Sequence, residues 1–387
     1  MISVENFYWS LWQHLLLPSN LHCFYYYPWG TQNHLSEFEY TRRKHRSDYN
    51  HVLFHFDQEP LYSHSPGKIY DARDSSWGFH KWAKILANSE RSQLKRNICT
   101  QRHFLDWYFF YHGFAALDWY RDGQYIEHEH EITTAYLCFN HLVQGRRSYR
   151  IGLLARLLDS DSVNNAAISF HGSYQDIVEE IQDPDTMVSE RSQRIIHRNL
   201  GTMRTMPWTV DQVLASGDLS ARFGYHEHRL WQSSFMHVVT ETVFYEPKLH
   251  LTEKVFKPIV AGRPFVLVSS PGALEYLREY GFKTFAPWID ESYDTITDHE
   301  ARLDAIALEI SRLHAMPLSE LKTLLAEMQP IMEHNRRHFF GRFRKIIVDE
   351  LVDNFDRCLR IWNNGRVDGR NLAVRPDLDT VKQILLR

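Results

Sequence analysis

The stretch from Leu249 to Gly272, LHLTEKVFKPIVAGRPFVLVSSPG, places one carboxylate and two ammonium groups close together. Glu253 and Lys254 are adjacent, and Lys257 follows Glu253 at the i,i+4 spacing of a helical turn. A carboxylate can accept hydrogen bonds from the two hydroxyls of a ribose, and ammonium groups can contact a diphosphate. These residue types indicate a site for a nucleotide diphosphate. The spacing also fits an ordinary surface ion pair between Glu253 and Lys257, and spacing alone leaves both interpretations open.

The neighbouring segments predict how a sheet would position these groups. FVLV at 265–268 carries no charge, as is typical of a strand that helices cover on both faces. MHVVTE predicts another strand over 236–241, and Thr252 is the expected N-cap of the helix that follows. Ligands of such sheets bind at the carboxyl ends of the strands, against helix N-termini. We therefore expect Glu241 and Thr252 to lie at the same site as Glu253.

The alternation of strand and helix continues on both sides of this segment. FNHLVQGRRSYR leaves a strand, crosses a polar loop and enters an amphipathic helix, and Arg147 and Arg150 lie where that helix begins. The expected strands are 134–139, 166–170, 236–241, 265–268 and 283–287, and the expected helices are 147–158, 173–181, 252–261 and 273–280. From Asp290 the pattern is helical to about 363, and an extended tail follows. Such a series is typical of a doubly wound sheet.

The N-terminal part predicts a second α/β domain. Its apolar and aromatic runs indicate strands at 22–27, 51–56, 83–89 and 107–114. The long connections between these runs favour helical crossovers and a largely parallel sheet. Near 121–133 the sequence turns polar and loses its apolar period. We therefore predict two Rossmann-like α/β domains, 1–130 and 131–363, the second ending in a helical region, and a tail at 364–387.

Composition narrows the class of protein. Hydrophobic residues make up 43% of the 387 residues, which is enough for substantial cores. A net charge of −4 gives no overall basic field for a polyanion. The four cysteines form no CxxC pair, which favours a reducing compartment and no structural zinc. With no long apolar run and no basic leader, we expect a soluble, cytoplasmic protein without a membrane span.

The segment VTETVFYEPKLHLTEKVFKPIVAGRPFVLVSSPGALEYLREYGFKTF resembles the nucleotide-sugar-binding segment of GT-B glycosyltransferases. The pattern is most similar to bacteriophage-encoded glycosyltransferases, and more remotely to fucosyltransferases, because both carry a [T/S]EK helix, small residues and an apolar strand. The likeness covers about 236–295, including FAPWIDESYD, and is fair in ANSE, HGFAALDWYRD and FNHLVQGRRSYR. The AGRPF break departs from the fucosyltransferase pattern, so the resemblance implies no particular sugar.

This resemblance implies a fold, an activity and roles for residues. The fold would be two Rossmann-like domains facing a cleft, and the reaction would transfer a sugar from a nucleotide-diphosphate sugar to a hydroxyl. Glu253 would hold the donor ribose, and Lys254 would contact the diphosphate. Arg147 or Arg150 would supply a second phosphate contact, for which the planar fork of arginine is suited. If the chain is phage-encoded, it would act in the host cytoplasm.

The acceptor hydroxyl needs a base, which the first domain would supply. Asp57 and Glu59 follow the apolar run HVLFHF and precede a proline, so we expect them at a strand's carboxyl end. His112 is a rival base, or else a hydrogen-bonded core histidine. The acceptor is either a glycan or, given the phage resemblance, a hydroxymethylated pyrimidine in DNA. A DNA acceptor would require base extrusion and a local basic strip.

Other patterns support alternative functions. His55-Phe56-Asp57 matches the H-x-D element of iron oxygenases, although those enzymes need an antiparallel barrel. The alternating Glu and His residues of 127–131 could bind a metal, or form a solvated segment. Asp159-Ser160-Asp161 mimics a D-x-D metal motif, but it follows a predicted helix, so we expect a turn. We therefore predict metal-independent transfer, with the nucleotide sugar as co-substrate and no further cofactor. A non-catalytic nucleotide- or glycan-binding protein is the alternative.

Overall fold

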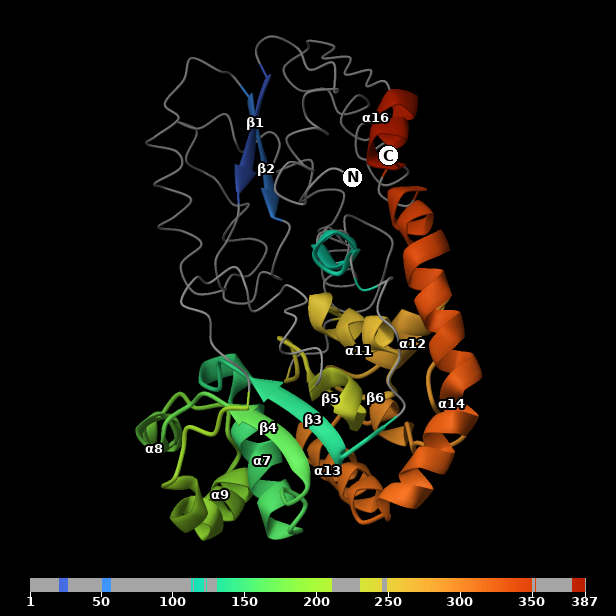
Figure 1. Ribbon diagram of the computed structural model, residues 1–387. Helices are drawn as coiled ribbons and strands as arrows, with labels where there is room; N and C mark the ends of the chain where they lie inside the picture. The colour runs from blue at the N-terminus through green and yellow to red at the C-terminus, as the bar shows by residue number, and fades with distance from the viewer. Residues whose placement is uncertain are drawn as a thin grey trace. The chain divides into compact units, whose positions relative to one another are not determined.

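The computed structural model describes most of the C-terminal two thirds of the chain (Figure 1). The described residues are 113–123 without 114 and 122, 131–210, 230–245, 249–349, 352 and 378–386, with the backbone of two strands at 21–26 and 51–56. The chain divides into two compact units, Met1–Asp118 with Arg344–Arg387, and Trp119–Phe343. The domain boundaries expected at 130 and 363 stay predictions.

Two predicted strands of the first unit are present. Strands β1 (Leu21–Tyr26) and β2 (His51–Phe56) pair in parallel, with Leu21 opposite His51. The parallel pairing is the one expected from a long connection. The expected strand at 83–89 and most of that at 107–114 lie outside the described residues.

The C-terminal residues differ from the extended tail that the sequence led us to expect. Residues Leu378–Leu386 form the helix α16. Apolar residues at 378, 381, 384 and 385 recur at helical spacing, and this short period explains the helix. The expectation was wrong because a single apolar stripe of nine residues is easily missed beside a polar stretch.

A four-stranded parallel sheet forms the centre of the second unit. Its strand order is β4-β3-β5-β6. The strands are β3 (Thr134–Asn140), β4 (Ala166–Phe170), β5 (Ser234–Thr240) and β6 (Phe265–Val268). All of β5 and β6 is buried, as expected for strands covered on both faces. These four strand predictions are confirmed, and the α/β class with them.

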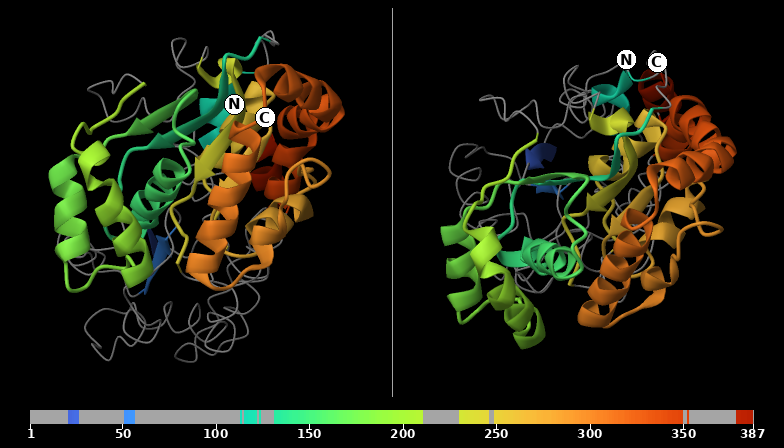
Figure 2. Two further views of the ribbon diagram at one scale, coloured as in Figure 1. Left: turned by 90° about the horizontal axis from the view of Figure 1, so that it is seen from below. Right: turned by 60° about the horizontal axis from the view of Figure 1, so that its bottom comes forward.

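Helices cover both faces of this sheet (Figures 1 and 2). One face carries α7 (Tyr149–Asp159) and α13 (His299–His314), with α9 (Glu190–Met203) packed against α7. The other carries α11 (Phe256–Ala261) and α14 (Leu318–His338). The shorter helices α8 (Tyr174–Gln182) and α12 (Ala273–Glu279) follow β4 and β6. In the part of the chain that the structure describes, no helix has both the length and the apolar character needed to cross a membrane.

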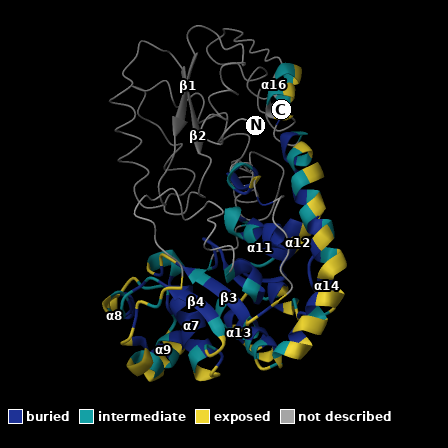
Figure 3. Ribbon diagram, in the orientation of Figure 1, coloured by how far each residue is buried: buried dark blue, intermediate teal, exposed yellow. Residues whose placement is uncertain are grey.

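Helix α7 is more deeply buried than an amphipathic helix would be (Figure 3). Every residue from Tyr149 to Leu157 is buried, including Arg150 and Arg156. The sequence predicted one apolar side, but α9 and α13 both pack against α7 and enclose it. Its two arginines are therefore buried charges that must find partners inside the protein.

The expected strand at 283–287 is absent. Residues 282–285 belong to no strand or helix, and side chains satisfy backbone groups of Lys283 and Phe285 instead. Asn335 on α14 accepts from the Lys283 N–H at 2.7 Å and donates to the Lys283 carbonyl at 2.8 Å. The Phe285 N–H donates to Glu291 at 2.6 Å. An amide side chain thus replaces the neighbouring strand that the apolar pattern predicted.

Gly281 ends helix α12 in a conformation that other residues rarely adopt. Its φ is +90°, and a Cβ there would lie 2.8 Å from Cε1 of His338. The His338 ring is held in place by a 2.7 Å contact of Nε2 with the Tyr280 carbonyl. An added methyl group would therefore meet both backbone strain and a steric clash.

We expect Gly281→Ala to destabilise the protein by about 1–3 kcal/mol. Gly201→Ala is the matched control, because Gly201 lies inside α9 and a Cβ there meets no atom within 4 Å. Since alanine is the better helix former, that variant should gain about 0.5–1 kcal/mol. Urea unfolding of both variants measures the difference, and equal effects would contradict the strain at residue 281.

Candidate functional site

The carboxyl ends of β3 and β5 form the switch point of the sheet. From β3 the chain crosses through α7 to β4 on one side, and from β5 it crosses through α11 to β6 on the other. The loops that leave these two adjacent strands therefore diverge (Figure 1). In open parallel sheets a ligand binds at this point. The loop after β3 contains Arg147, and the segment after β5 contains Glu241 and Glu253.

Arg150 joins the two diverging loops to each other. Its guanidinium donates to the Leu142 carbonyl at 2.6 Å, and to the carbonyls of Thr240 and Glu241 at 2.9 and 3.2 Å. The Tyr149 hydroxyl also donates to the Glu241 carbonyl, at 2.5 Å. Arg150 is buried, and these contacts direct its donors to the protein backbone. The sequence predicted Arg150 as a phosphate ligand. In the structure its guanidinium instead links the loop after β3 to the end of β5, and we call this set of contacts the Arg150 clamp.

Glu241 and Thr252 form a buried pair that fixes the start of the next helix. The Glu241 carboxylate accepts from the Thr252 N–H at 3.0 Å and from its hydroxyl at 2.6 Å. Burial raises the pKa of Glu241, opposed by the nearby charge of Lys254 and by the bonds from Thr252. Thr252 is the N-cap, as predicted, and its oxygen accepts from the Lys254 N–H. Both residues position the groups that follow them.

Glu253 and Lys254 lie together on the first turn after this cap, the 3-10 helix η4 (Glu253–Val255). Lys254 Nζ contacts the Glu253 carboxylate at 3.0 Å and the Thr252 hydroxyl at 3.1 Å. The Glu253 side chain is 14% exposed and that of Lys254 35%, so solvent reaches both. A ligand at the switch point could therefore contact both groups.

Lys257 points in another direction. Its ammonium lies over the Trp231 ring, 5.3 Å from the centroid, in a cation–π contact. Trp231 precedes β5, at the amino end of that strand. The ion pair considered from the sequence, between Glu253 and Lys257, is replaced by the pair between Glu253 and Lys254. The structure thus brings Lys254, but not Lys257, to Glu253.

The helix N-termini at this edge are occupied by groups of the protein itself. Ser173 and Asp176 form a capping box at α8. Asp294 accepts from the Leu274 and Glu275 N–H groups at the start of α12, at 3.0 and 3.3 Å. After β3, the Gly145 N–H donates to Glu180 at 2.7 Å. Because side chains already satisfy these donors, a bound anion would depend on cationic side chains more than the sequence suggested.

Cationic side chains flank the switch point on both loops. Arg147 is half-buried in the 3-10 helix η3 (Gly145–Arg147), two residues before Tyr149. Lys254 follows the Thr252 cap on the other loop. The Tyr149 hydroxyl donates to the main-chain carbonyl of Glu241, so each cation lies close in the chain to a contact that joins the two loops. This arrangement can attract a diphosphate.

Several residues of this edge were missed by the sequence analysis. His141 and His171 directly follow β3 and β4, and their ring centroids are 5.1 Å apart. The Thr240 hydroxyl donates to the Asn140 side chain at 2.9 Å, which adds a side-chain hydrogen bond between the carboxyl ends of the paired strands β3 and β5. A signal for the two histidines was available, because His171 comes immediately after the predicted strand 166–170 and His141 two positions after the predicted strand 134–139. The Thr240–Asn140 contact could not be found without the strand order.

The other predicted residues divide into those that are described and those that are not. Asp57, Glu59 and His112 lie outside the described residues, as does the acidic stretch before Glu131. Asp159 is the last residue of α7, and Ser160 and Asp161 begin the turn that follows, as expected; the Asp159 carboxylate accepts from Asn199 at 2.6 Å. Among the described residues, no three His, Cys, Asp or Glu side chains form a group that could hold a metal ion.

Neither protein-family models nor curated proteins give a match to this chain. The interpretation of the site therefore depends on its own chemistry. That chemistry is a carboxylate beside an ammonium group on one loop and an arginine on the other, at the carboxyl edge of a parallel sheet.

Proposed function

We propose that this protein is a glycosyltransferase of the GT-B type, which moves a sugar from a nucleotide-diphosphate sugar to an acceptor hydroxyl. One observation carries the proposal: Glu253 and Lys254 lie together on the first turn after β5, while Arg147 flanks the same switch point from the loop after β3. The resemblance of 236–295 to nucleotide-sugar-binding segments supports the same interpretation. Its two Rossmann-like domains are part of the proposal.

Each of these side chains has a role in the proposed reaction. Glu253 accepts hydrogen bonds from the ribose hydroxyls, and Lys254 and Arg147 contact the diphosphate. The bond between the anomeric carbon and the diphosphate oxygen breaks, and a bond to the acceptor oxygen forms. Lys254 and Arg147 stabilise the charge that develops on the departing diphosphate. The acceptor proton goes to a base of the first unit, for which Asp57, Glu59 and His112 are the proposed residues.

The Arg150 clamp prepares this site for its ligand. Arg150, Tyr149 and the Glu241–Thr252 pair fix both loops through hydrogen bonds of 2.5 to 3.2 Å. A site whose groups are already in place does not have to order them on binding. We propose that Arg150, Glu241 and Thr252 act by positioning, and that Arg147, Glu253 and Lys254 contact the donor.

The acceptor is proposed to be a glycan or a hydroxymethylated pyrimidine in DNA. These two acceptors differ in charge, so the salt dependence of turnover distinguishes them. A DNA acceptor gives a rate that falls steeply as salt rises, because binding releases counterions, whereas a neutral glycan gives a flat response.

A thermal-shift panel of nucleoside diphosphates and their sugars tests the donor site. A ligand at about 100 times its Kd stabilises the folded state by about 2.7 kcal/mol, which raises the melting temperature by several degrees. We expect at least one nucleotide to do so, and Arg147→Ala and Lys254→Ala to reduce its shift. Arg194→Ala and Lys283→Ala, at exposed positions away from this edge, are the matched controls. If no nucleotide raises the melting temperature, the proposal fails. Binding without sugar transfer or hydrolysis would favour a non-catalytic nucleotide-binding protein.

A further inference from the structure

A cavity lies along helix α14. Its volume is about 830 Å³, which is within the range of small-molecule sites. The described residues that line it come from α14, from the turn η6 (Phe339–Phe343) and from the turn after α11: Gly262, Arg263, Lys322, Leu325, Ala326, Gln329, Met332, Glu333, Arg336, Arg337 and Phe340. The residues of α14 recur every three or four positions, so they form one stripe along the helix.

This cavity is separate from the candidate donor site. Gly262 and Arg263 lead into the amino end of β6, which begins at Phe265. The Arg263 guanidinium donates to the Ser234 carbonyl at 3.0 Å, where β5 begins, and to the Gln232 carbonyl. The donor site lies at the carboxyl ends of the same strands. The turn that lines the cavity therefore belongs to the opposite edge of the sheet.

The middle of the cavity is apolar. Leu325 and Met332 lie seven positions apart on α14, which is about two turns, and the short Ala326 side chain leaves space beside them. The ring of Phe340 lies 5.9 Å from the Arg336 guanidinium carbon. An apolar or aromatic group could therefore fill this part of the cavity, with cations close to it.

The charges that line the cavity are mostly positive. Among the described lining residues there are four cations, Arg263, Lys322, Arg336 and Arg337, and one carboxylate, Glu333, whose oxygen accepts from Gln329 at 3.0 Å. The whole chain, in contrast, has a net charge of −4. The cavity is therefore a local basic region on an acidic protein.

Lys322 and Arg337 are exposed cations of this cavity. Several exposed arginines of the same unit pair with carboxylates: Arg191, Arg194, Arg198, Arg278 and Arg312. Among the described residues, no carboxylate lies within ion-pair distance of Lys322 or Arg337. Their charges stand at the two ends of the stripe and are not neutralised there.

Arg336 adds a partly desolvated charge between these two. Its guanidinium donates to the Gly123 carbonyl at 2.7 Å, and burial lowers its pKa. An anion close to this guanidinium would reduce the cost of burying its charge, because the interaction is stronger where water is largely excluded.

We propose that this cavity binds an organic anion, a carboxylate, phosphate or sulfonate carried on an apolar or aromatic body. The anionic group would contact either Arg336 together with Arg337, at one end of the stripe, or Lys322, at the other end. The apolar or aromatic body would pack on Leu325, Met332 and Phe340. This site is independent of the proposed glycosyl transfer, because it shares no residue with the switch point.

The fluorescent probe 1-anilinonaphthalene-8-sulfonate tests this proposal on the full-length protein, because it combines an aromatic body with one sulfonate. N-phenyl-1-naphthylamine has the same rings without the charge and is the matched neutral probe. We expect saturable binding of the sulfonate, weakened about tenfold in the double variant Lys322→Ala/Arg337→Ala through loss of charge-assisted contacts. Binding of the neutral probe should change by less than about twofold.

Two further variants make the result specific. Ala326→Trp fills the cavity at an exposed position and should abolish saturable binding of both probes, whereas Arg194→Ala, on α9, should change neither. Circular dichroism confirms that each variant is folded. The proposal is overturned if the double variant binds the sulfonate as tightly as the unchanged protein, or if Ala326→Trp still binds it. Displacement by a nucleoside diphosphate would place the probe at the other site and also overturn the proposal, without affecting the proposed donor site.

Discussion

Replacing Glu253 with alanine is expected to weaken nucleotide-sugar binding about 10- to 100-fold while the protein stays folded. A hydrogen bond to a charged group contributes about 1.5–3 kcal/mol, and each 1.4 kcal/mol is a factor of ten in affinity. The contribution of Glu253 to stability is much smaller. Its ion-pair partner Lys254 is 35% exposed, and a first-turn carboxylate adds only about 0.3–1 kcal/mol through the helix dipole.

Titration calorimetry with the nucleotide that gives the largest thermal shift measures this loss. Glu275→Ala is the matched control, because Glu275 is the exposed first-turn carboxylate of the neighbouring helix α12. Glu253→Gln keeps one accepting oxygen without the charge, so we expect it to fall between the two. If Glu253→Ala binds the nucleotide as tightly as Glu275→Ala does, Glu253 does not hold the ribose.

The strands of the second unit could be predicted because each is a short apolar run with clear ends. AAISF and FVLV match β4 and β6 residue for residue. The Thr252 cap could also be predicted, because a hydroxyl followed by Glu and Lys is a local signal. The position of Glu253 at the start of a helix beyond a strand end followed from these two. The sequence therefore predicted those parts of the site that depend on residues close to one another in the chain.

The remaining features depend on partners that are distant in the sequence. Arg150 binds the carbonyls of Thr240 and Glu241, some ninety positions away, and nothing in its own segment indicates this. Asn335 replaces a strand beside Lys283, across 52 positions. Lys257 turns to Trp231 rather than to Glu253. In each case a long-range contact overrides a reasonable local interpretation, and only the packing of the helices on the sheet brings the partners together.

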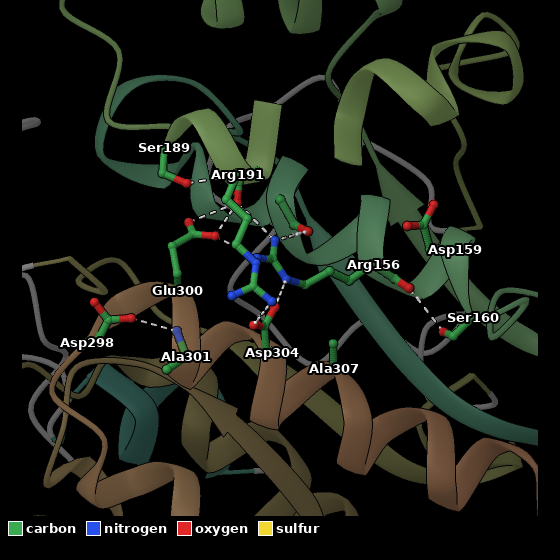
Figure 4. A network of polar contacts seen from close by, with 12 residues as sticks. Arg156, Asp159, Ser160, Ser189, Arg191, Asp298, Glu300, Ala301, Asp304 and Ala307 are labelled. Atoms are coloured by element: carbon green, nitrogen blue, oxygen red, sulfur yellow. Dashed lines mark hydrogen bonds and ion pairs between the residues drawn. The ribbon is translucent and has the colours of Figure 1, made fainter. Parts of the chain in front are cut away.

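The buried Arg156 is the strongest example of such long-range contacts (Figure 4). From α7 its guanidinium donates to Glu300 and Asp304 on α13, each at 2.7 Å. It also donates to the Ser192 hydroxyl on α9 at 2.9 Å and to the Gly152 carbonyl at 3.0 Å. One side chain thus joins three helices on one face of the sheet.

We expect Arg156→Met to lower the free energy of unfolding by about 3 kcal/mol. Methionine fills much of the space, but it leaves the largely buried Glu300 carboxylate, 14% exposed, without its cation. Breaking a buried pair by removing one partner costs about 3–5 kcal/mol, and the lower end applies here. Asp304 is 31% exposed and keeps its ion pair with Arg191. The loss of its contact with Arg156 therefore lowers the free energy of unfolding only slightly.

The loss should depend on pH in a defined direction. Burial alone would raise the pKa of Glu300, but bonds from Ser189 and Ser192 and the charge of Arg156 outweigh it, and the pKa lies below its ordinary value of 4.5. A carboxyl whose pKa is lower in the folded state contributes stability above its unfolded pKa, and loses it as the pH falls through the folded pKa. The difference between the unchanged protein and Arg156→Met should therefore be largest near pH 7 and shrink below about pH 4.5.

Urea unfolding at pH 7 and at pH 4 separates this charge effect from a loss of packing. A packing defect would cost the same at both values, whereas a stranded carboxylate costs less once it is protonated. Adding Glu300→Gln to Arg156→Met removes the stranded charge, so the double variant should regain part of the stability at pH 7. Arg194→Met, on the exposed side of α9, should change stability by less than about 0.5 kcal/mol. An equal loss at both pH values, with no recovery in the double variant, would mean that Arg156 stabilises the three helices by filling space and not by its charge.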